Sequence, residues 1–266
     1  MYDQFNRPIN YLRISVTDRC NLRCSYCMPE EGIHLLRHED ILTFDEIRDF
    51  TKTAVACGID KVRITGGEPL VRKGIVKLTS MIAGIDGIRD LSMTTNGTIL
   101  DQFAGDLYKA GLQRINISLD TVDPEKYAYL TRNGDLNNVF KGIEAAKRAN
   151  LTPIKINCVI KDSKTEKDAM EVSAFCKSNG LELRYIKEMD LATGTFSTVD
   201  GGTGGHCSSC NRLRLTSNGK LKPCLFNNAE VDIREIGYER AIKMAIEMKP
   251  EQGMNNLKNE FYNIGG

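Results

Sequence analysis

The chain has 266 residues, enough for one large domain or a domain with an appendage. Its hydrophobic content of 41% is ordinary for a globular protein, and its net charge of +1 argues against broad attraction to nucleic acid or to a membrane surface. We find neither a signal-peptide pattern nor an apolar run near the roughly 18 residues of a membrane span. We therefore expect a cytoplasmic protein with no nucleic-acid or membrane partner.

Short β-branched segments alternate with helical patterns along the first two thirds of the chain. The expected strands are residues 10–17, 61–66, 90–97, 114–120, 154–160 and 182–188, and the clearest helices are 43–57, 137–150 and 163–180. Thr43 and Glu46 have the spacing of a capping box, and Gly180 is placed as a C-cap. Six such alternations predict an α/β fold with a parallel sheet, and we expect a partial (β/α)6 barrel.

The pattern changes after Met189. We expect residues 1–189 to form the barrel domain. Residues 190–205, which contain five glycines, are expected to form a flexible linker after it. Residues 206–266 then form a small C-terminal segment, with a β-hairpin turning at Asn218–Gly219 and a helix over about 234–248. The linker could span on the order of 50 Å, which would let this segment reach the mouth of the barrel.

Three cysteines near the N-terminus, Cys20, Cys24 and Cys27, have the spacing CxxxCxxC. A structural zinc knuckle is one interpretation, but it normally requires a fourth ligand, and none stands at a familiar offset. A 4Fe–4S cluster held by three cysteines would leave one iron free to bind the amine and carboxylate of a small molecule. Nine cysteines in a chain expected in the cytosol also favour metal binding over disulfides.

This spacing, with the aromatic Tyr26 before the last cysteine, resembles the signature of the radical S-adenosylmethionine (SAM) superfamily. The segment ITGGEP (64–69) matches the superfamily's GGEP element, and TTNG and ISLD end the next two strands. The resemblance implies a cluster-bound SAM whose reductive cleavage gives a 5′-deoxyadenosyl radical. It also implies four SAM-binding residues: Tyr26, Gly67, Ser118 and Met189.

A second set of cysteines, Cys207, Cys210 and Cys224, has the spacing CxxC-x13-C, and the hairpin between them would bring Cys224 back to the pair. Zinc completed by His206 is the simpler alternative. The wording CSSCNRLRLTSNGKLKPCLF, however, resembles the GTP 3′,8-cyclase family of molybdenum-cofactor biosynthesis (MoaA type). That resemblance implies a second 4Fe–4S cluster whose open iron contacts the guanine, and a tail, here Gly265–Gly266, that reaches the active site.

The same resemblance implies that the chain is a GTP-binding lyase that converts GTP to 3′,8-cyclo-7,8-dihydro-GTP. Its implied GTP contacts are Arg13, Arg63, Thr94, Lys155, Arg212, Leu213 and Arg214, with Arg184 as a weaker candidate. Arg212 and Arg214 are two apart, so in a strand both point to one face, where forked donors suit a triphosphate. The implied partners are a low-potential electron donor such as flavodoxin or ferredoxin and a pyranopterin-forming synthase; a homodimer is left open.

Three alternatives remain at this point. The chain could be another radical SAM enzyme, such as a peptide maturase with auxiliary clusters, or a non-catalytic iron–sulfur or zinc protein. Only 17 residues separate Met189 from Cys207, where family members carry several tens more, so a compact variant, a divergent paralogue or a deletion is also open.

The other three cysteines, Cys57, Cys158 and Cys176, have no partners at ligand spacing and are expected in the core.

Overall fold

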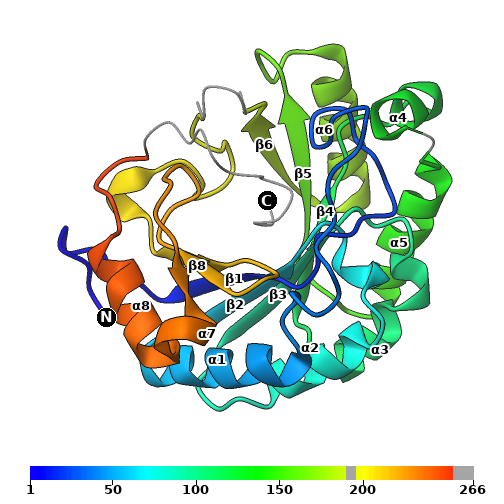
Figure 1. The fold of residues 1–266 in the computed structure, drawn as a ribbon. Helices are drawn as coiled ribbons and strands as arrows, with labels where there is room; N and C mark the ends of the chain where they lie inside the picture. Colours follow the sequence, from blue (N-terminus) through cyan, green and yellow to red (C-terminus); the bar gives the residue numbers. More distant parts are fainter. Residues whose placement is uncertain (133, 190–195, 254–266) are drawn as a thin grey trace.

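The computed structural model describes residues 1–132, 134–189 and 196–253. A single nine-stranded sheet runs through it in the order β6-β5-β4-β3-β2-β1-β7-β8-β9 (Figure 1). Every neighbouring pair from β6 to β7 is parallel, and β7–β8 and β8–β9 are antiparallel. The strands are β1 (Tyr11–Ser15), β2 (Lys61–Thr65), β3 (Asp90–Thr95), β4 (Arg114–Ser118), β5 (Ile154–Ile160), β6 (Glu182–Lys187), β7 (Arg212–Leu215), β8 (Lys220–Lys222) and β9 (Val231–Asp232).

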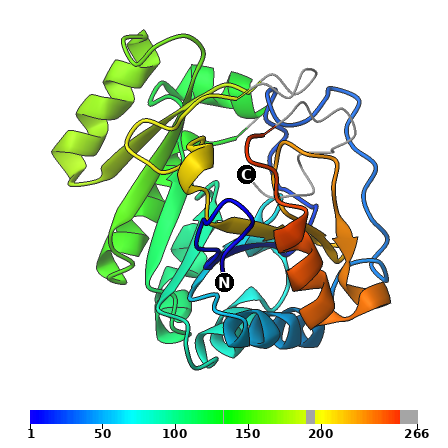
Figure 2. The same cartoon turned by 90° about the vertical axis from the view of Figure 1, so that its left-hand side faces the viewer.

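Helices cover the outer face of the curved sheet, as Figures 1 and 2 show. The outward side chains of the central strands are Leu, Ile, Val and Met, and they are fully or almost fully buried against these helices. The helices are α1 (Phe44–Ala56), α2 (Ile75–Ala83), α3 (Ala104–Lys109), α4 (Pro124–Thr131), α5 (Leu136–Arg148), α6 (Lys167–Asn179), α7 (Ile233–Ile236) and α8 (Tyr238–Glu247), with short 3-10 turns at Pro69–Val71, Leu100–Gln102 and Cys207–Ser209.

The local signals found in the sequence are confirmed. The Thr43 hydroxyl accepts a hydrogen bond from the Glu46 amide (3.2 Å) while the Glu46 carboxylate accepts one from the Thr43 amide (2.7 Å), which completes the capping box of α1. Gly180 ends α6 in the left-handed conformation, with φ of 64°. Asn218 and Gly219 lie in the turn between β7 and β8. The α/β fold with a partial six-stranded βα barrel is therefore confirmed.

Two features differ from the expectation. The single helix expected over about 234–248 is two helices, α7 and α8, because Gly237 has φ of 81° and interrupts the helical backbone. In addition, part of the expected linker packs against the barrel. Tyr185 in β6 and Asp200 form a two-way backbone bridge (3.0 and 3.1 Å), and Gly201 approaches Leu183 so closely that a Cβ would lie 2.7 Å from its carbonyl oxygen. Residues 196–205 are thus not a free tether.

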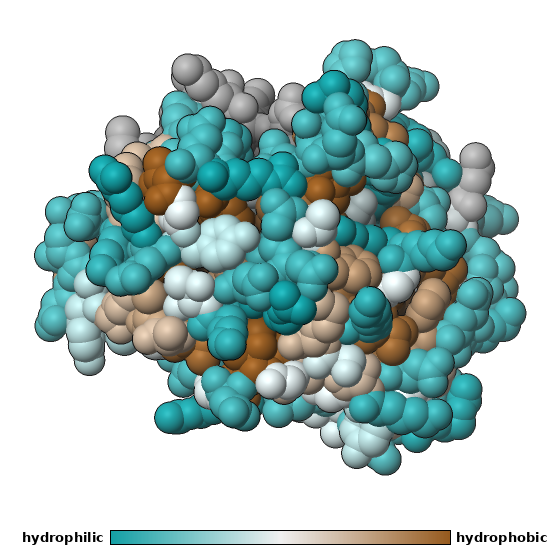
Figure 3. Space-filling model, turned by 60° about the horizontal axis from the view of Figure 1, so that its bottom comes forward, coloured by the Kyte–Doolittle hydropathy of each residue, from teal (hydrophilic) through white to brown (hydrophobic). Residues whose placement is uncertain are grey.

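The C-terminal segment is joined to the barrel through the sheet itself. β7 pairs in parallel with β1, with Tyr11 opposite Arg212 and Arg13 opposite Arg214. Figures 1 and 2 show this hairpin beside β1, with α8 next to α1 and to the N-terminal segment. Figure 3 shows hydrophobic side chains only as small patches among hydrophilic ones on the face that it presents. Within the described residues, no helix is long and apolar enough to cross a membrane.

Candidate active site

The inner face of the sheet carries polar and cationic side chains. Parallel register places Arg214, Arg13 and Arg63 side by side on β7, β1 and β2, and Ser92 follows on β3. The three arginines are only 7–9% exposed. Neighbouring strands lie about 4.8 Å apart, so the guanidinium groups are crowded. Six strands with alternating apolar and polar residues therefore build an outer core and an inner cationic wall from the same segments.

The cationic groups on this wall repel one another. Burial and the nearby Arg214 guanidinium lower the pKa of Arg13 well below its usual value. Burial and repulsion from Arg212 lower the pKa of Arg214 to about 10. Burial also lowers the pKa of Arg63 and of Arg184. A cluster of buried like charges is costly in the free protein and is stabilised by an anionic ligand.

Buried polar atoms without a partner gather on the same wall. Within the described residues, the buried side-chain nitrogen and oxygen atoms without a hydrogen bond are Tyr11 Oη, Arg13 Nε, Thr94 Oγ1, Arg114 Nη1, Arg184 Nε and Arg212 Nε. All six residues belong to strands of the sheet and alternate with its outward apolar residues. Unpaired buried polar atoms cost about 1–3 kcal/mol each, so their concentration on one face indicates a site that a polar ligand completes.

The first cysteine triplet lies in the loop that follows β1, at the carboxyl end of the parallel strands. The Cys24 carbonyl accepts hydrogen bonds from the amides of Cys27 (3.0 Å) and Met28 (2.9 Å), which folds the CSYC stretch into a compact turn. The Cys20 sulfur accepts one from the Leu22 amide (3.4 Å), and Asn96 Nδ2 lies 3.9 Å from it. All three thiols are free of disulfides.

This loop is fixed by contacts that the sequence did not predict. The amides of Arg23 and Ser25 donate to the Thr131 and Leu130 carbonyls at the end of α4 (3.2 and 2.9 Å). Arg132 caps α4 in the left-handed conformation and donates to the Arg23 and Met28 carbonyls (3.1 and 3.0 Å). These contacts hold the cysteine loop through backbone groups and Arg132, without using the thiols.

The GGEP turn packs directly against the segment that leads to Cys20. The Gly67 and Glu68 amides donate to the Thr17 and Arg19 carbonyls (2.7 and 2.8 Å). Glu68 is fully buried, and its carboxylate accepts from the Leu70 amide, the Thr95 hydroxyl and the Asn96 amide at 2.6–3.0 Å. Burial raises the pKa of Glu68 to about 7, and these donors offset part of that effect. The turn thereby connects the ends of β1, β2 and β3.

The residues expected to bind SAM surround the same end of the sheet. Ser118 is half-buried at the carboxyl end of β4, and Met189 is half-buried just after β6. Tyr26 is hydrogen-bonded through its hydroxyl to Asp120, and burial raises the pKa of both groups. Asp120 also accepts a hydrogen bond from the Val159 amide (2.8 Å), so it links the cysteine loop to β5. Sequence reasoning did not identify Asp120.

The second cysteine triplet lies at the other end of the strands. Cys207 and Cys210 precede β7, which is parallel to β1, and Cys224 follows β8, which is antiparallel to β7. The three cysteines are therefore at the amino end of the barrel strands, not at the mouth as the linker length suggested. β1 has five residues, so its length is roughly 16 Å at about 3.3 Å per residue. The cationic wall lies between the two triplets.

The cysteines fit iron–sulfur clusters better than single ions. Within the described residues, no three His, Cys, Asp or Glu side chains are grouped so that they could hold one metal ion. An iron–sulfur cluster does not need such convergence, because each cysteine binds a different iron. Burial raises the pKa of Cys20 to about 11 and that of Cys24 to about 12, so iron, when bound, would have to stabilise their thiolates. Burial acts to raise the pKa of Cys210, but Lys249 and Arg212 outweigh it and the pKa is lowered.

Comparisons with known proteins agree with this arrangement. The Radical SAM superfamily model matches residues 14–176, and the Molybdenum Cofactor Synthesis C model matches residues 156–260. The chain is 41% identical to the GTP 3′,8-cyclase of Thermodesulfovibrio yellowstonii, with 96% of each chain covered. The chain belongs to the GTP 3′,8-cyclase family of radical SAM enzymes. The family member of Alkaliphilus oremlandii is 40% identical over 95% of this chain and 94% of its own.

The GTP 3′,8-cyclase relatives are longer than this chain. The first alignment extends over 309 residues, against 266 in this chain, so the relative carries residues that this chain lacks. Solved structures support the fold alone, because their identity is low. Streptococcus suis SuiB bound to precursor peptide SuiA matches 93% of this chain and 66% of its own with a TM-score of 0.66 at 15% identity. Native anSMEcpe with bound AdoMet matches 92% of this chain and 81% of its own with a TM-score of 0.63 at 15% identity.

The structure brings most of the predicted substrate residues of this cyclase-family chain together. Arg13, Arg63, Thr94, Arg212 and Arg214 share the inner face, and Arg184 reaches it from β6, where its Nη1 lies 3.4 Å from Asn116 Oδ1. Lys155 is on the same face but forms an ion pair with Glu182. The Leu213 side chain lies on the opposite face, 1% exposed in the core, so only its backbone is near the wall. Gly265–Gly266 lie outside the described residues.

Sequence reasoning missed two members of the wall. Tyr11 stands opposite Arg212, and the Arg63 guanidinium lies over its ring, 5.6 Å from the centroid. Arg114 forms a paired contact with Asp90 (2.9 and 2.6 Å), and one of its nitrogens remains without a partner. The signal that could have found them is the two-residue period, since Tyr11 is in phase with Arg13 and Arg114 is in phase with Asn116 and Ser118.

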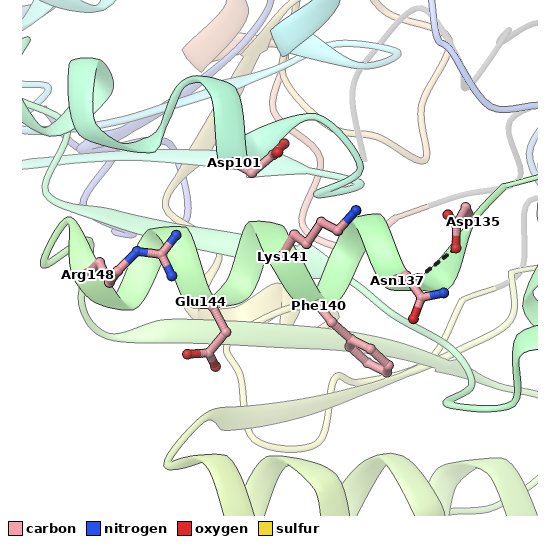
Figure 4. Close-up of a pocket in the computed structure, with 7 residues that line it drawn as sticks. All are labelled: Asp101, Asp135, Asn137, Phe140, Lys141, Glu144 and Arg148. Atoms are coloured by element: carbon pink, nitrogen blue, oxygen red, sulfur yellow. Dashed lines mark hydrogen bonds between the residues drawn. The ribbon is translucent and has the colours of Figure 1, made fainter.

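A separate depression lies on the outside of α5. Figure 4 shows that it is lined by side chains of both signs, including Asp101, Lys141, Glu144 and Arg148. Asp135 caps the start of α5 by accepting a hydrogen bond from the Asn137 amide (2.9 Å). None of the predicted site residues lines it. The mixed charge of the depression gives no preference for an anion, so we assign the chemistry to the inner wall.

Replacing Gly67 by alanine is expected to impair SAM binding and to lower the free energy of unfolding by about 1–3 kcal/mol. A Cβ at this position would lie 2.5 Å from the Arg19 carbonyl oxygen and 2.9 Å from that of Asp18, so the turn must move away from the loop leading to Cys20. Thermal melts and equilibrium dialysis with SAM measure the two effects. Gly105→Ala is the matched control, because a Cβ there has nothing within 4 Å. Equal melting and equal SAM affinity of the two variants would contradict the expectation.

Proposed function

We propose that this chain is a GTP 3′,8-cyclase that uses SAM to convert GTP to 3′,8-cyclo-7,8-dihydro-GTP in molybdenum-cofactor biosynthesis. The observation that carries the proposal is the wall of buried, closely spaced arginines between two cysteine triplets. The chain as a whole has a net charge of only +1, so the positive charge is concentrated where a polyanion would bind. A triphosphate would satisfy both the charges and the unpaired donors.

The carboxyl end of the sheet would serve the first cluster and SAM. Cys20, Cys24 and Cys27 would ligate three irons, with Tyr26, Gly67, Ser118 and Met189 around the SAM. When bound, the cluster and SAM supply the 5′-deoxyadenosyl radical that removes a hydrogen atom from the ribose. The chain's own contribution is position: the GGEP turn, the α4 end and Asp120 hold the cysteine loop in register with the sheet.

The inner wall would bind the substrate. Arg13, Arg63, Arg212 and Arg214 would donate hydrogen bonds to the triphosphate, supported by Thr94, Lys155 and Arg184. Leu213 would contribute only through its backbone, because its side chain is in the core. Cys207, Cys210 and Cys224 would hold the second cluster at the amino end of the strands, facing the guanine. Substrate would thus bridge the two ends, which fixes its orientation for a radical reaction.

The proposal extends to partners and location. The reaction consumes an electron at low potential, so a flavodoxin- or ferredoxin-like donor would supply it. The product would pass to a pyranopterin-forming synthase. We place the protein in the cytoplasm, where cysteines remain reduced, and a homodimer is compatible with the proposal.

The deciding experiment is anaerobic incubation of the reconstituted protein with dithionite, SAM and GTP. We expect 5′-deoxyadenosine to form together with the cyclised nucleotide, and both to depend on iron reconstitution. Mass spectrometry of quenched samples measures both products. SAM cleavage without any consumption of GTP would contradict the substrate assignment, and the absence of cleavage would contradict the enzyme assignment.

The runner-up is a radical SAM enzyme acting on a peptide, which the fold of SuiB would accommodate. The arginine wall argues against it, because an ordinary peptide does not offer several charges to guanidinium groups buried this deeply. Replacing GTP by GDP, GMP and a basic peptide in the same assay separates these two classes. If the arginine wall binds the triphosphate, turnover should fall from GTP to GDP to GMP.

A further inference from the structure

Lys249, just after α8, is a buried lysine next to the second cysteine triplet. It is 1% exposed. Its ammonium donates to the Arg212 carbonyl (2.8 Å), to the Pro223 carbonyl (2.7 Å) and to the Cys210 sulfur (3.5 Å). The three contacts use all three hydrogens of the ammonium group. The Arg212 carbonyl is at the first residue of β7 and the Pro223 carbonyl comes just after β8, so the ammonium is held between the two ends of the hairpin.

The buried charge of Lys249 has no carboxylate partner within the described part of the chain. The two lysines of strand β8 differ in this respect. Lys220 pairs with Asp232 (2.7 Å) and Lys222 pairs with Glu230 (3.1 Å). Burial of an ammonium group that is compensated only by neutral carbonyls is costly. The negative charge that could compensate Lys249 is therefore that of the neighbouring cysteine sulfurs.

A second buried cation fixes the same region from the N-terminal side. Arg7 is 4% exposed and forms an ion pair with Asp3 (2.6 Å). It donates to the carbonyls of Cys207 (2.8 Å), Pro250 (2.7 Å) and Glu251 (2.9 Å). Arg7 therefore joins the start of the CxxC pair to the residues that follow Lys249. Because its charge is paired with Asp3, Arg7 acts as a clamp, whereas Lys249 has no such carboxylate among the residues that the structure describes.

We propose that Lys249 is a positioning residue that supplies the counter-charge of the second iron–sulfur cluster through an N–H···S hydrogen bond to Cys210. The inference rests on the proposed second cluster but not on the identity of the substrate. A cation and a hydrogen bond at a cluster sulfur stabilise the reduced form, which carries one more negative charge. Lys249 should therefore raise the reduction potential of this cluster relative to a chain with a neutral residue.

The test isolates the second cluster in the full-length chain by replacing Cys20, Cys24 and Cys27 with alanine. The cluster is reconstituted anaerobically and titrated with dithionite, and the reduced form is followed by electron paramagnetic resonance. For Lys249→Met and Lys249→Gln we expect the ratio of reduced to oxidised cluster at a fixed potential to fall at least tenfold. For a one-electron couple this equals a midpoint about 59 mV more negative. Lys249→Arg should restore most of the potential.

Lys220→Met is the matched control, since it removes a lysine from the same hairpin whose partner is Asp232. Its potential should equal that of the unsubstituted chain. If Lys249 had only a structural role, its replacement by Met or Gln would change cluster retention and the melting temperature, but the reduction potential would equal that of the control. That result would overturn the proposal. So would failure of the triple-alanine chain to assemble any cluster.

A measurement that leaves Lys249 unchanged covers Lys249 variants that do not fold. In the triple-alanine chain labelled with ¹⁵N at lysine, pulsed electron paramagnetic resonance spectra of the reduced second cluster should show coupling to one lysine nitrogen. Absence of that coupling would overturn the inference. If the coupling and the potential shift are present but GTP is not consumed, the inference stands and the proposed substrate fails. The two proposals are therefore tested separately.

Discussion

Replacement of Cys24 by alanine is expected to abolish SAM cleavage completely, with or without GTP. Cys24 is the middle one of the three proposed ligands, and a cluster held by only two cysteines is not expected to be retained. The backbone should survive the change, because the turn depends on the Cys24 carbonyl, which accepts from the amides of Cys27 and Met28. Anaerobic iron and sulfide analysis and chromatographic measurement of 5′-deoxyadenosine give the result.

Cys210→Ala provides the matched comparison. This variant should lose the second cluster and the cyclised product while SAM cleavage continues without coupling to GTP. Cys57→Ala is the control for loss of a cysteine, since Cys57 is the C-cap of α1 and is not one of the six proposed ligands, so the change should affect neither product. If Cys24→Ala and Cys210→Ala lose both products equally, the two triplets do not have separate tasks. Retention of SAM cleavage in Cys24→Ala would refute the ligand assignment itself.

Much of the fold could be predicted because the signals are local. The six parallel strands follow from short β-branched segments that alternate with helical patterns, and the ends of α1 and α6 follow from Thr43, Glu46 and Gly180. The position of the C-terminal hairpin could not be predicted in this way. β7 pairs in parallel with β1, about two hundred positions away in the sequence. No local sequence pattern specifies which strand a given strand pairs with.

In the candidate site, too, the short-range features could be predicted and the long-range contacts could not. The spacing within CxxxCxxC and within NRLRL is short-range, so the cysteines and the alternating arginines could be recognised in the sequence. The residues that the sequence did not reveal act across long separations. Arg132 fixes the cysteine loop from the end of α4, Lys249 reaches Cys210 from the residue after the C-cap of α8, and Arg7 reaches Cys207 from the N-terminus. In the sequence these three residues do not differ from other basic residues, and only the fold brings them next to the cysteine segments.

The short connection before the second triplet also has a different meaning in the structure. From the sequence, 17 residues between Met189 and Cys207 raised the question of how a short glycine-rich segment could hold the second cluster in place. The sheet performs that task instead. β7 hydrogen-bonds to β1, whose other end leads into the first triplet, so one strand pair sets the distance between the two ends of the wall. Variation in the length of the segment can therefore be tolerated without moving either triplet.

Removal of one buried arginine of the wall should stabilise the free protein and weaken GTP binding at the same time. Arg13 and Arg214 are adjacent, almost fully buried and mutually repulsive, and repulsion from Arg214 contributes to the lowered pKa of Arg13. Arg13→Met removes that repulsion and leaves a side chain of similar length. We expect the free energy of unfolding to rise by on the order of 1 kcal/mol, or about 2–4 °C in Tm. Loss of a buried charged contact to the substrate should cost about 2–5 kcal/mol in binding, so the Kd for GTP should rise at least 30-fold.

Opposite signs for stability and binding distinguish a ligand site from a structural cluster. If the arginines were held by the fold for its own stability, Arg13→Met would lower the melting temperature. If they were surface groups without a role, neither the melting temperature nor the affinity for GTP would change. That is the result we expect for the control Arg89→Met, because the Arg89 side chain is 83% exposed. Thermal melts with and without GTP measure both quantities in one experiment. Added GTP should raise the Tm of the unsubstituted chain much more than that of Arg13→Met, because the triphosphate brings negative charge to the buried guanidinium groups.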